Sequence, residues 1–206
     1  MKIIKPSVEI IDKLTPEEIL KKLELCGRVC YKSEDKITAE SAVKFISNIV
    51  KSGHESVLEH VSFSVRFICD RGVTHEMVRH RIASYSQEST RYCNYSKEGF
   101  GSEITVIEPL YLVPGTRAYN VWQTACELSE EMYFKLLNEG CLGQEARAVL
   151  PNSLKTEIIM TANIREWRHF LKLRTSKAAH PQIREVANML LTELNFMLPS
   201  LFDDII

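Results

Sequence analysis

The sequence predicts an α+β fold: a single domain with a small, mainly antiparallel β-sheet packed against several helices. Two periodicities indicate it. Apolar residues alternate with polar ones from Val61 to Cys69, whereas most other apolar residues recur at helical spacing. The 206 residues contain no repeat, low-complexity tract or linker. One domain spanning residues 1–206 is therefore the simplest organisation.

Strands are expected in four places. Residues 2–11 read as an opening strand, and the alternating segment 61–69 reads as a half-buried one. Residues 104–107 suggest a further short strand, and residues 154–162 look extended. The hydroxyl-rich stretch 84–96 follows neither period, so we expect an ordered loop there.

Helices are expected where apolar residues recur every three or four positions. Thr15 and Pro16 are typical of a helix start, and Gly53 and Gly140 are typical of helix ends. Asp70-Arg71-Gly72 is expected to turn the chain. The predicted helices follow Thr15, Thr38 and Pro114-Gly115, and further ones lie at 73–82, 164–174 and 183–198.

The charge balance excludes some classes of partner. The formal net charge is −1, so no global field draws the chain to nucleic acid or to an anionic membrane. Any anion must therefore be held locally. The first residues break their apolar run too early for a signal peptide, and no run approaches the roughly 18 apolar residues that span a bilayer. We expect a cytoplasmic protein.

The cysteines point to no chemistry of their own. The chain lacks a CxxC pair, so buried, reduced thiols are the better interpretation, and none has a neighbouring base that would make it a nucleophile. The six are Cys26, Cys30, Cys69, Cys93, Cys126 and Cys141.

A lysine-free, arginine-rich segment indicates an anion site. Between Ser52 and Ser96 there are five arginines, interleaved with short hydrogen-bond donors. The planar guanidinium binds phosphate through paired hydrogen bonds, and a helix end that runs into a loop of N–H groups can cradle the same anion. We therefore expect a phosphate-bearing ligand near Arg66, Arg71, Arg79, Arg81 and Arg91.

The string from Arg79 to Tyr92 carries a family resemblance. It begins Arg79-His80-Arg81, continues for seven residues to Ser89 and closes with Arg91-Tyr92. This pattern resembles the signature of the flavin-dependent thymidylate synthases. Further segments resemble other motifs of that family, in the same order: residues 53–60, 146–151 and 163–174.

The resemblance implies a methyltransferase. Such an enzyme converts dUMP to dTMP with 5,10-methylenetetrahydrofolate as carbon donor, FAD as hydride carrier and NADPH as reductant. It would act as a homotetramer with active sites shared between subunits, and it would need no metal. Arg174 would lie at the uracil edge as the catalytic residue and favour the ionised N3 form, because a fixed guanidinium stabilises a developing anion.

The resemblance also implies two sets of binding residues. The FAD contacts would be Ser56, Arg79, His80, Arg81, Gln87, Asn163, Ile164, Arg165 and His169. The dUMP contacts would be Glu76, Arg79, Gln87, Glu88, Ser89, Thr90, Arg91, Arg147 and Arg174. Ser89 lacks a local base, so ligand contact is its expected role and nucleophilic attack is not.

Three positions depart from the commonest family pattern. Many members carry glutamine where Glu76 stands, some carry glutamate at Gln87, and some carry asparagine at His169. An ionised carboxylate donates no hydrogen bond, so Glu76 could pair with His80, one turn further on, in place of the nucleotide contact. His169 could still stack on a flavin or hydrogen-bond to it.

Helix geometry adds an inference about the site. If residues 164–174 form an unbroken helix, Arg165 and His169 share one face, while Arg174 points about 180° away from Arg165. One helix could then serve two active sites. We therefore predict that ligands bind between subunits.

The sequence also has features of three other classes of function. His75-Glu76 followed by His80 resembles a zinc-binding HExxH helix, but the second histidine comes one residue late, so the rings lie about 140° apart rather than about 40°. Arginines mixed with Tyr85, Tyr92 and Tyr95 could stack on RNA bases, yet the chain is not basic.

The third class is a structural protein whose arginines only form ion pairs. It explains any single arginine better than a ligand does, but it does not explain the clustered arrangement. Arg168 and the glutamates between residues 127 and 131 are expected to be solvated.

Overall fold

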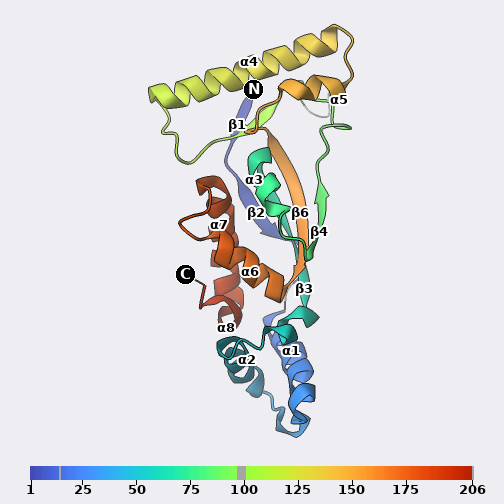
Figure 1. Ribbon diagram of the computed structural model, residues 1–206, viewed down its shortest axis with the longest axis vertical. Helices are drawn as coiled ribbons and strands as arrows, with labels where there is room; N and C mark the ends of the chain where they lie inside the picture. The colour runs from blue at the N-terminus through green and yellow to red at the C-terminus, as the bar shows by residue number, and fades with distance from the viewer. Residues whose placement is uncertain (14, 97–100, 206) are drawn as a thin grey trace. The chain divides into compact units, whose positions relative to one another are not determined.

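The computed structural model describes residues 1–13, 15–96 and 101–205 (Figure 1). These residues form two compact units that interleave along the chain. Unit 1 contains Met1–Ser7, Phe67–Arg79 and Ser86–Ile159, and unit 2 contains Val8–Arg66, His80–Tyr85 and Met160–Ile206. Because the units interleave, neither is a continuous piece of sequence.

The predicted α+β class is confirmed. A four-stranded antiparallel sheet has the order β2-β3-β6-β4, and a two-stranded parallel sheet pairs β1 with β5 in the register Lys2↔Thr105. The strand bounds are β1 Lys2–Ile4, β2 Ser7–Ile10, β3 Ser62–Asp70, β4 Ala83–Gln87, β5 Thr105–Ile107 and β6 Lys155–Asn163.

Two strand predictions were wrong in part. The opening segment 2–11 forms two strands, β1 and β2, which belong to different sheets on either side of Pro6. Proline has no N–H for a ladder and a fixed φ, so the chain changes its pairing partner there. The stretch predicted as a loop from Ser84 begins as strand β4, whose serines are exposed while Tyr85 and Gln87 are half-buried.

The helices of unit 2 surround an apolar core. Its buried side chains include Leu23, Ile46, Phe63, Trp167 and Leu194. Trp167 stacks on Phe63 at a ring-centroid distance of 5.2 Å, and its indole N–H donates to the Phe63 carbonyl oxygen. The helices are α1 Pro16–Tyr31, η1 Glu34–Lys36, α2 Ser41–Lys51, η2 Glu55–His60, α6 Ile164–Arg174, α7 Pro181–Met197 and α8 Pro199–Phe202.

Unit 1 has its own core, in which Tyr95, Val106, Cys126, Tyr133 and Leu154 pack together. Its helices are α3 Arg71–Met77, α4 Arg117–Asn138, α5 Gly143–Ala146 and η4 Arg147–Val149. No helix among the described residues is both long and apolar enough to cross a membrane.

Helix α3 begins earlier and ends earlier than predicted. The expected turn at Asp70 is the N-cap of α3, because the Asp70 carboxylate accepts a hydrogen bond from the Val73 N–H at 2.9 Å. The helix ends at Met77, not at residue 82. His80 therefore lies outside α3, on the segment that leads into β4.

The expectation that Arg168 is solvated was wrong. Its side chain is only 1% exposed and contacts carboxylates of Glu55 at 3.2 Å and Asp204 at 2.7 Å, and the Leu201 carbonyl oxygen. The Arg168 guanidinium holds the pKa of Asp204 below its ordinary value. Both carboxylates are far away in sequence, so local patterning could not reveal the burial.

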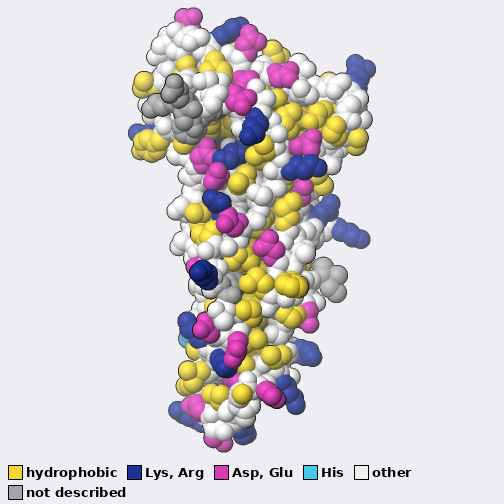
Figure 2. Space-filling model, turned by 180° about the vertical axis from the view of Figure 1, so that it is seen from behind, with side chains coloured by type: hydrophobic (Ala, Val, Ile, Leu, Met, Phe, Trp, Pro, Cys, Tyr) yellow, Lys and Arg dark blue, Asp and Glu magenta, His cyan; other side chains and the backbone are white. Residues whose placement is uncertain are grey.

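The surface is mixed in character. On the face drawn in Figure 2, exposed hydrophobic side chains lie among basic and acidic ones. Helix α4 exposes apolar side chains at helical spacing, with Val121 63% and Leu128 51% exposed. These side chains, two helical turns apart, form an apolar stripe on the exposed face of α4.

Candidate active site

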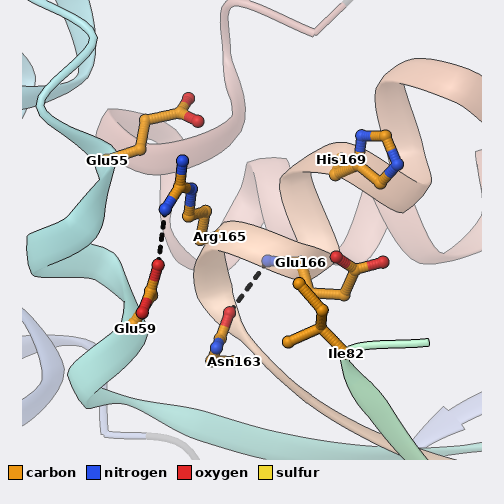
Figure 3. A pocket seen from close by; sticks show the side chains of 7 residues that line it. All are labelled: Glu55, Glu59, Ile82, Asn163, Arg165, Glu166 and His169. Carbon is orange, nitrogen blue, oxygen red and sulfur yellow. Dashed lines mark hydrogen bonds and ion pairs between the residues drawn. The ribbon is translucent and has the colours of Figure 1, made fainter. Parts of the chain in front are cut away.

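The face of α6 that carries Arg165 and His169 borders a cavity of about 400 Å³ in unit 2 (Figure 3). This volume lies near the lower end of the range for ligand sites, roughly 300–1,000 Å³. The lining residues come from η2, α6 and the segment before β4: Glu55, Glu59, Ile82, Asn163, Arg165, Glu166 and His169.

Helix α6 starts where the sequence predicted and presents two predicted residues to this cavity. The Asn163 side-chain oxygen caps it by accepting from the Glu166 N–H at 2.9 Å. The helix continues unbroken to Arg174, and Arg165 and His169 line the same cavity, so the predicted shared face is confirmed. The cap also fixes the position of the Asn163 side chain at the cavity wall.

An exposed ion pair lies across the cavity. The Arg165 guanidinium donates to the Glu59 carboxylate at 2.5 Å, and Figure 3 shows it pointing toward η2. The hydrogen bond that Arg165 donates to the Glu59 carboxylate raises the pKa of Arg165. Both side chains are about half exposed, at 51% and 46%, so water screens their attraction. Ser56, on the same 3₁₀ turn as Glu59, is exposed.

His80 is buried between two charged side chains of α6. Its Nδ1 lies 2.9 Å from a Glu166 carboxylate oxygen, and the Arg174 Nε–H donates to its Nε2 at 3.1 Å. Burial and the Arg174 charge lower the pKa of His80, against an opposing effect of Glu166. The hypothesis of a pair with Glu76 was wrong, because both ring nitrogens face residues of α6.

In unit 1 the last residue of β4 and the segment that follows it are held in place by side-chain hydrogen bonds. Gln87 donates to the hydroxyls of Thr74 at 3.0 Å and Thr156 at 3.3 Å. The Glu88 carboxylate accepts from Lys155 at 3.0 Å and from the Tyr95 hydroxyl at 3.3 Å. Lys155 thus offsets the negative charge of Glu88, whose carboxylate is bonded to protein groups. These bonds fix the start of the predicted nucleotide loop.

Two arginines with neutral partners meet at the rest of this loop, Arg91 from the loop itself and Arg147 from η4. Arg147, at the start of η4, donates to the Thr90 hydroxyl at 3.2 Å. Arg91 donates to the side-chain oxygen of Gln144 at 3.1 Å. The Ser89 hydroxyl accepts from the Arg91 N–H at 3.3 Å. The structure therefore brings Arg147 to the loop, as the sequence predicted.

Comparison with known proteins identifies the family. Residues 9–200 match the sequence model of the family described as "Thymidylate synthase complementing protein". The chain is 35% identical over 192 residues to a flavin-dependent thymidylate synthase of Geobacter sulfurreducens, covering 87% of this chain and 79% of the relative. The chain belongs to the flavin-dependent thymidylate synthase family.

Other relatives agree. A flavin-dependent thymidylate synthase of Pyrococcus furiosus is 37% identical over 169 residues, 82% of this chain and 68% of the relative. Among solved structures, the UMP/dUMP methylase PolB of Streptomyces cacaoi, bound with 5-Br dUMP, superposes with a TM-score of 0.78 at 26% identity. That match covers 98% of this chain and 96% of the other. As a member of this family, the chain is a methyltransferase enzyme.

The remaining predicted residues of this thymidylate synthase family member lie in different environments. Arg79 and Arg81 are exposed on either side of buried His80. Glu76 is half-buried on α3. Ile164 is buried, and its backbone N–H donates to the Val61 carbonyl oxygen, so its side chain belongs to the core.

One arrangement resembles a metal site at first sight. His80, Glu166 and His169 offer ligand atoms that lie within 4.8 Å of one another. Both nitrogens of His80 are engaged, however, and the Arg174 cation lies against the ring. This disfavours a dication there, and the expected absence of a metal stays a prediction. The Glu76 and His75 pair of the HExxH-like string contributes nothing to this cluster.

Sequence reasoning missed Glu59, Glu166 and Gln144 as neighbours of the predicted residues. Glu59 stands inside the quoted motif segment 53–60, and Glu166 occupies the third position after the Asn163 cap. These two positions in the sequence could have indicated that Glu59 and Glu166 lie beside the predicted site residues. Gln144 carried none, because its contact with Arg91 spans 53 residues.

Proposed function

We propose that this protein methylates dUMP to dTMP with 5,10-methylenetetrahydrofolate as carbon donor, FAD as hydride carrier and NADPH as reductant. The observation that carries the proposal is the pair Arg91 and Arg147, whose side chains are held by neutral amide and hydroxyl oxygens. Two oriented and uncompensated guanidinium groups favour a phosphate dianion.

The nucleotide region would bind through groups that already face the same loop. Arg91, Arg147 and the hydroxyls of Ser89 and Thr90 would hold the 5′-phosphate. Gln87 and Glu88, whose side chains are bound to protein, would fix the loop and offer backbone groups. Glu76 and Arg79, at and after α3, complete the proposed dUMP contacts.

The cavity of unit 2 fits part of a flavin nucleotide. Arg165, which lines the cavity, and Ser56, which is exposed on the same 3₁₀ turn as Glu55 and Glu59, would offer donors for a phosphate. His169 and Ile82 would offer flat or apolar surface for a ring. Asn163 with the backbone of Ile164, Gln87, and the segment Arg79-His80-Arg81 complete the proposed FAD contacts. When bound, FAD would supply the hydride chemistry that amino-acid side chains lack.

Arg174 is the proposed catalytic residue. Its guanidinium would stabilise negative charge on the uracil as N3 ionises and C5 becomes nucleophilic. A preorganised charge acts on such a step without having to reorient during the reaction. No cysteine is needed, and burial raises the pKa of the Cys69 and Cys126 thiols, which disfavours their thiolate forms.

We further propose a homotetramer with active sites shared between subunits. FAD joins a tricyclic ring to a diphosphate and an adenosine, which is more than a cavity of about 400 Å³ encloses. The apolar stripe on α4 offers a surface for association. A ligand-bound structure in which one chain supplies every contact would contradict shared sites. The single-domain organisation and the cytoplasmic location stay predictions.

The test begins with the colour of the purified protein. We expect a yellow protein that releases FAD, and dTMP formation that requires dUMP, methylenetetrahydrofolate and NADPH together. Omitting each in turn is the control. UMP, tested beside dUMP, measures selectivity for the deoxyribose. A colourless oligomer that binds neither flavin nor dUMP would overturn the proposal.

A further inference from the structure

Glu166, His80 and Arg174 form one connected row of hydrogen bonds in unit 2. Glu166 Oε1 lies 2.9 Å from His80 Nδ1, and His80 Nε2 lies 3.1 Å from Arg174 Nε. The side chains of Glu166 and His80 are only 7% and 2% exposed. Water therefore cannot readily replace either partner, and each bond constrains the next.

The chemistry of the three groups fixes where the proton lies. An arginine Nε–H is always a donor at ordinary pH, so His80 Nε2 must offer a lone pair to Arg174. A neutral imidazole carries one N–H, which is then on Nδ1 and donates to the Glu166 carboxylate. One tautomer of His80 satisfies both neighbours. The other would set the Nε2–H against the Arg174 N–H and leave Glu166 without a donor.

Packing holds the ring in this orientation. The Phe170 ring meets the His80 ring edge-on at a centroid distance of 5.0 Å, and the Tyr85 hydroxyl donates to the His80 carbonyl oxygen at 2.6 Å. Glu166, Phe170 and Arg174 follow one another at intervals of four residues, so they share one face of α6. That face meets His80 at three successive points.

We propose that Glu166, acting through His80, positions the guanidinium of Arg174. Glu166 is a positioning residue: it fixes the His80 tautomer, and His80 in turn fixes the Nε end of Arg174. With Nε held by this hydrogen bond, the other two guanidinium nitrogens of Arg174 keep one direction. This inference rests on the proposed function, in which Arg174 is the catalytic residue.

The electrostatics favour the neutral ring. The charged and titratable groups that face His80 are Glu166, His169 and Arg174 of α6 and Tyr85 of β4. Burial, Arg174 and His169 lower the pKa of His80, and Glu166 raises it. Burial raises the pKa of Tyr85 to about 12, so that phenol keeps its proton throughout the neutral range. His80 thus keeps its Nε2 lone pair at neutral pH.

The primary test compares Glu166→Gln with Glu166→Ala in the purified full chain with its flavin. A glutamine oxygen can still accept from Nδ1–H, so we expect Glu166→Gln to lose less than about tenfold in kcat. Glu166→Ala removes the acceptor, and we expect a loss of roughly 10–100-fold, as is typical when a group that orients a functional residue is removed. The KM for dUMP should change less than kcat does.

Glu24→Ala is the matched control. Glu24 is also a buried glutamate of unit 2, 1% exposed and bonded to Arg28, but it lies on α1 away from the row. We expect its kcat per folded enzyme to equal that of the wild type. Equal kcat values for Glu166→Ala and the wild type would overturn the proposal, and so would equal losses in both Glu166 variants.

A pH profile separates positioning from a merely structural role. Protonation of His80 places a hydrogen on Nε2 and breaks its bond with Arg174, so kcat should fall as the pH drops through the His80 pKa. Because Glu166 raises that pKa, Glu166→Gln should move this acid limb to lower pH. An acid limb that stays in place would contradict the inference.

Crystal structures of the variants provide a readout that does not depend on activity. We expect Arg174 Nε to stay bonded to His80 in Glu166→Gln and to leave it in Glu166→Ala. An unchanged Arg174 in the alanine variant would overturn the positioning role. If the wild type makes no dTMP, the proposed function fails, and these structures still decide whether Glu166 orders Arg174.

Discussion

The two arginine-bearing regions of this molecule hold their cations in opposite ways. In unit 2, Arg165 is paired with the Glu59 carboxylate and Arg174 is bonded to a histidine that itself contacts Glu166. In unit 1, Arg91 and Arg147 are bonded to an amide and a hydroxyl. The first region is balanced by acids, whereas the second keeps its positive charge.

The acidic side chains of the same region of unit 1 are bonded to groups other than Arg91 and Arg147. Glu88 is occupied by Lys155 and Tyr95, and the Glu145 carboxylate accepts from the Leu142 N–H at 2.8 Å. Within residues 1–13, 15–96 and 101–205, neither Arg91 nor Arg147 forms an ion pair. A phosphate would therefore displace only neutral partners in unit 1, but it would have to displace Glu59 in unit 2.

The largest effect should come from the balanced region. Arg174→Ala removes the guanidinium that we propose to lie at the uracil edge, and we expect dTMP formation to fall by a factor of at least about 100, the usual cost of losing an electrostatic stabiliser. FAD should stay bound, because the variant leaves the Arg165 face of α6 intact. Turnover assays and the flavin absorbance of the same sample measure both.

Lys22→Ala, an exposed cation on α1, is the control for loss of charge. Near-normal turnover in Arg174→Ala would remove Arg174 from the catalytic role. Loss of flavin from that variant would instead show that FAD binding depends on the Arg174 side of α6 as well as on its Arg165 side.

A smaller effect is expected for the uncompensated region. Arg91→Ala and Arg147→Ala each remove a charged hydrogen-bonding group, which costs about 1.5–3 kcal/mol. That cost corresponds to a dUMP affinity weaker by roughly 10–150-fold. Calorimetry with dUMP measures it. Deoxyuridine, which lacks the phosphate, is the matched ligand, and its affinity should not change. Equal losses for both ligands would place these arginines elsewhere than at the phosphate.

How much of this contrast the sequence could predict depends on how far apart in the sequence the contacting residues are. Helix α6 and the shared face of Arg165 and His169 follow from local spacing, and they were predicted, whereas the Asn163 cap is a local signal that the helix prediction did not use. The contact between Arg147 and Thr90 was anticipated only through the family resemblance, because 57 residues separate them.

The failures share one physical cause. The partners of His80 and Arg168 come from distant segments, and nothing local distinguishes a buried histidine or arginine from a solvated one. Strand β4 was missed because its inward residues are alanine, tyrosine and glutamine, which form a weakly apolar face. Pro6 was a local signal for the division between β1 and β2 that the strand prediction did not use.

The smallest effect tests whether Glu59 competes with a ligand for Arg165. Glu59→Gln removes the negative charge that is bonded to Arg165 but keeps a hydrogen-bond acceptor, so the flavin would meet a less compensated cation, with Glu55 as the carboxylate that still acts on it. The pair is about half exposed, and such pairs contribute little, so FAD should bind tighter by less than about fivefold. Arg165→Ala should weaken FAD instead.

Fluorescence titration of the flavin-free protein with FAD measures both variants of this pair. Weaker FAD binding in Glu59→Gln would mean that the carboxylate orients Arg165 for the ligand and does not compete with it. Arg165 would then be an arginine that Glu59 orients in advance for its ligand. The contrast with Arg91 and Arg147 would lie in how each guanidinium is oriented, because net charge would no longer distinguish the two regions.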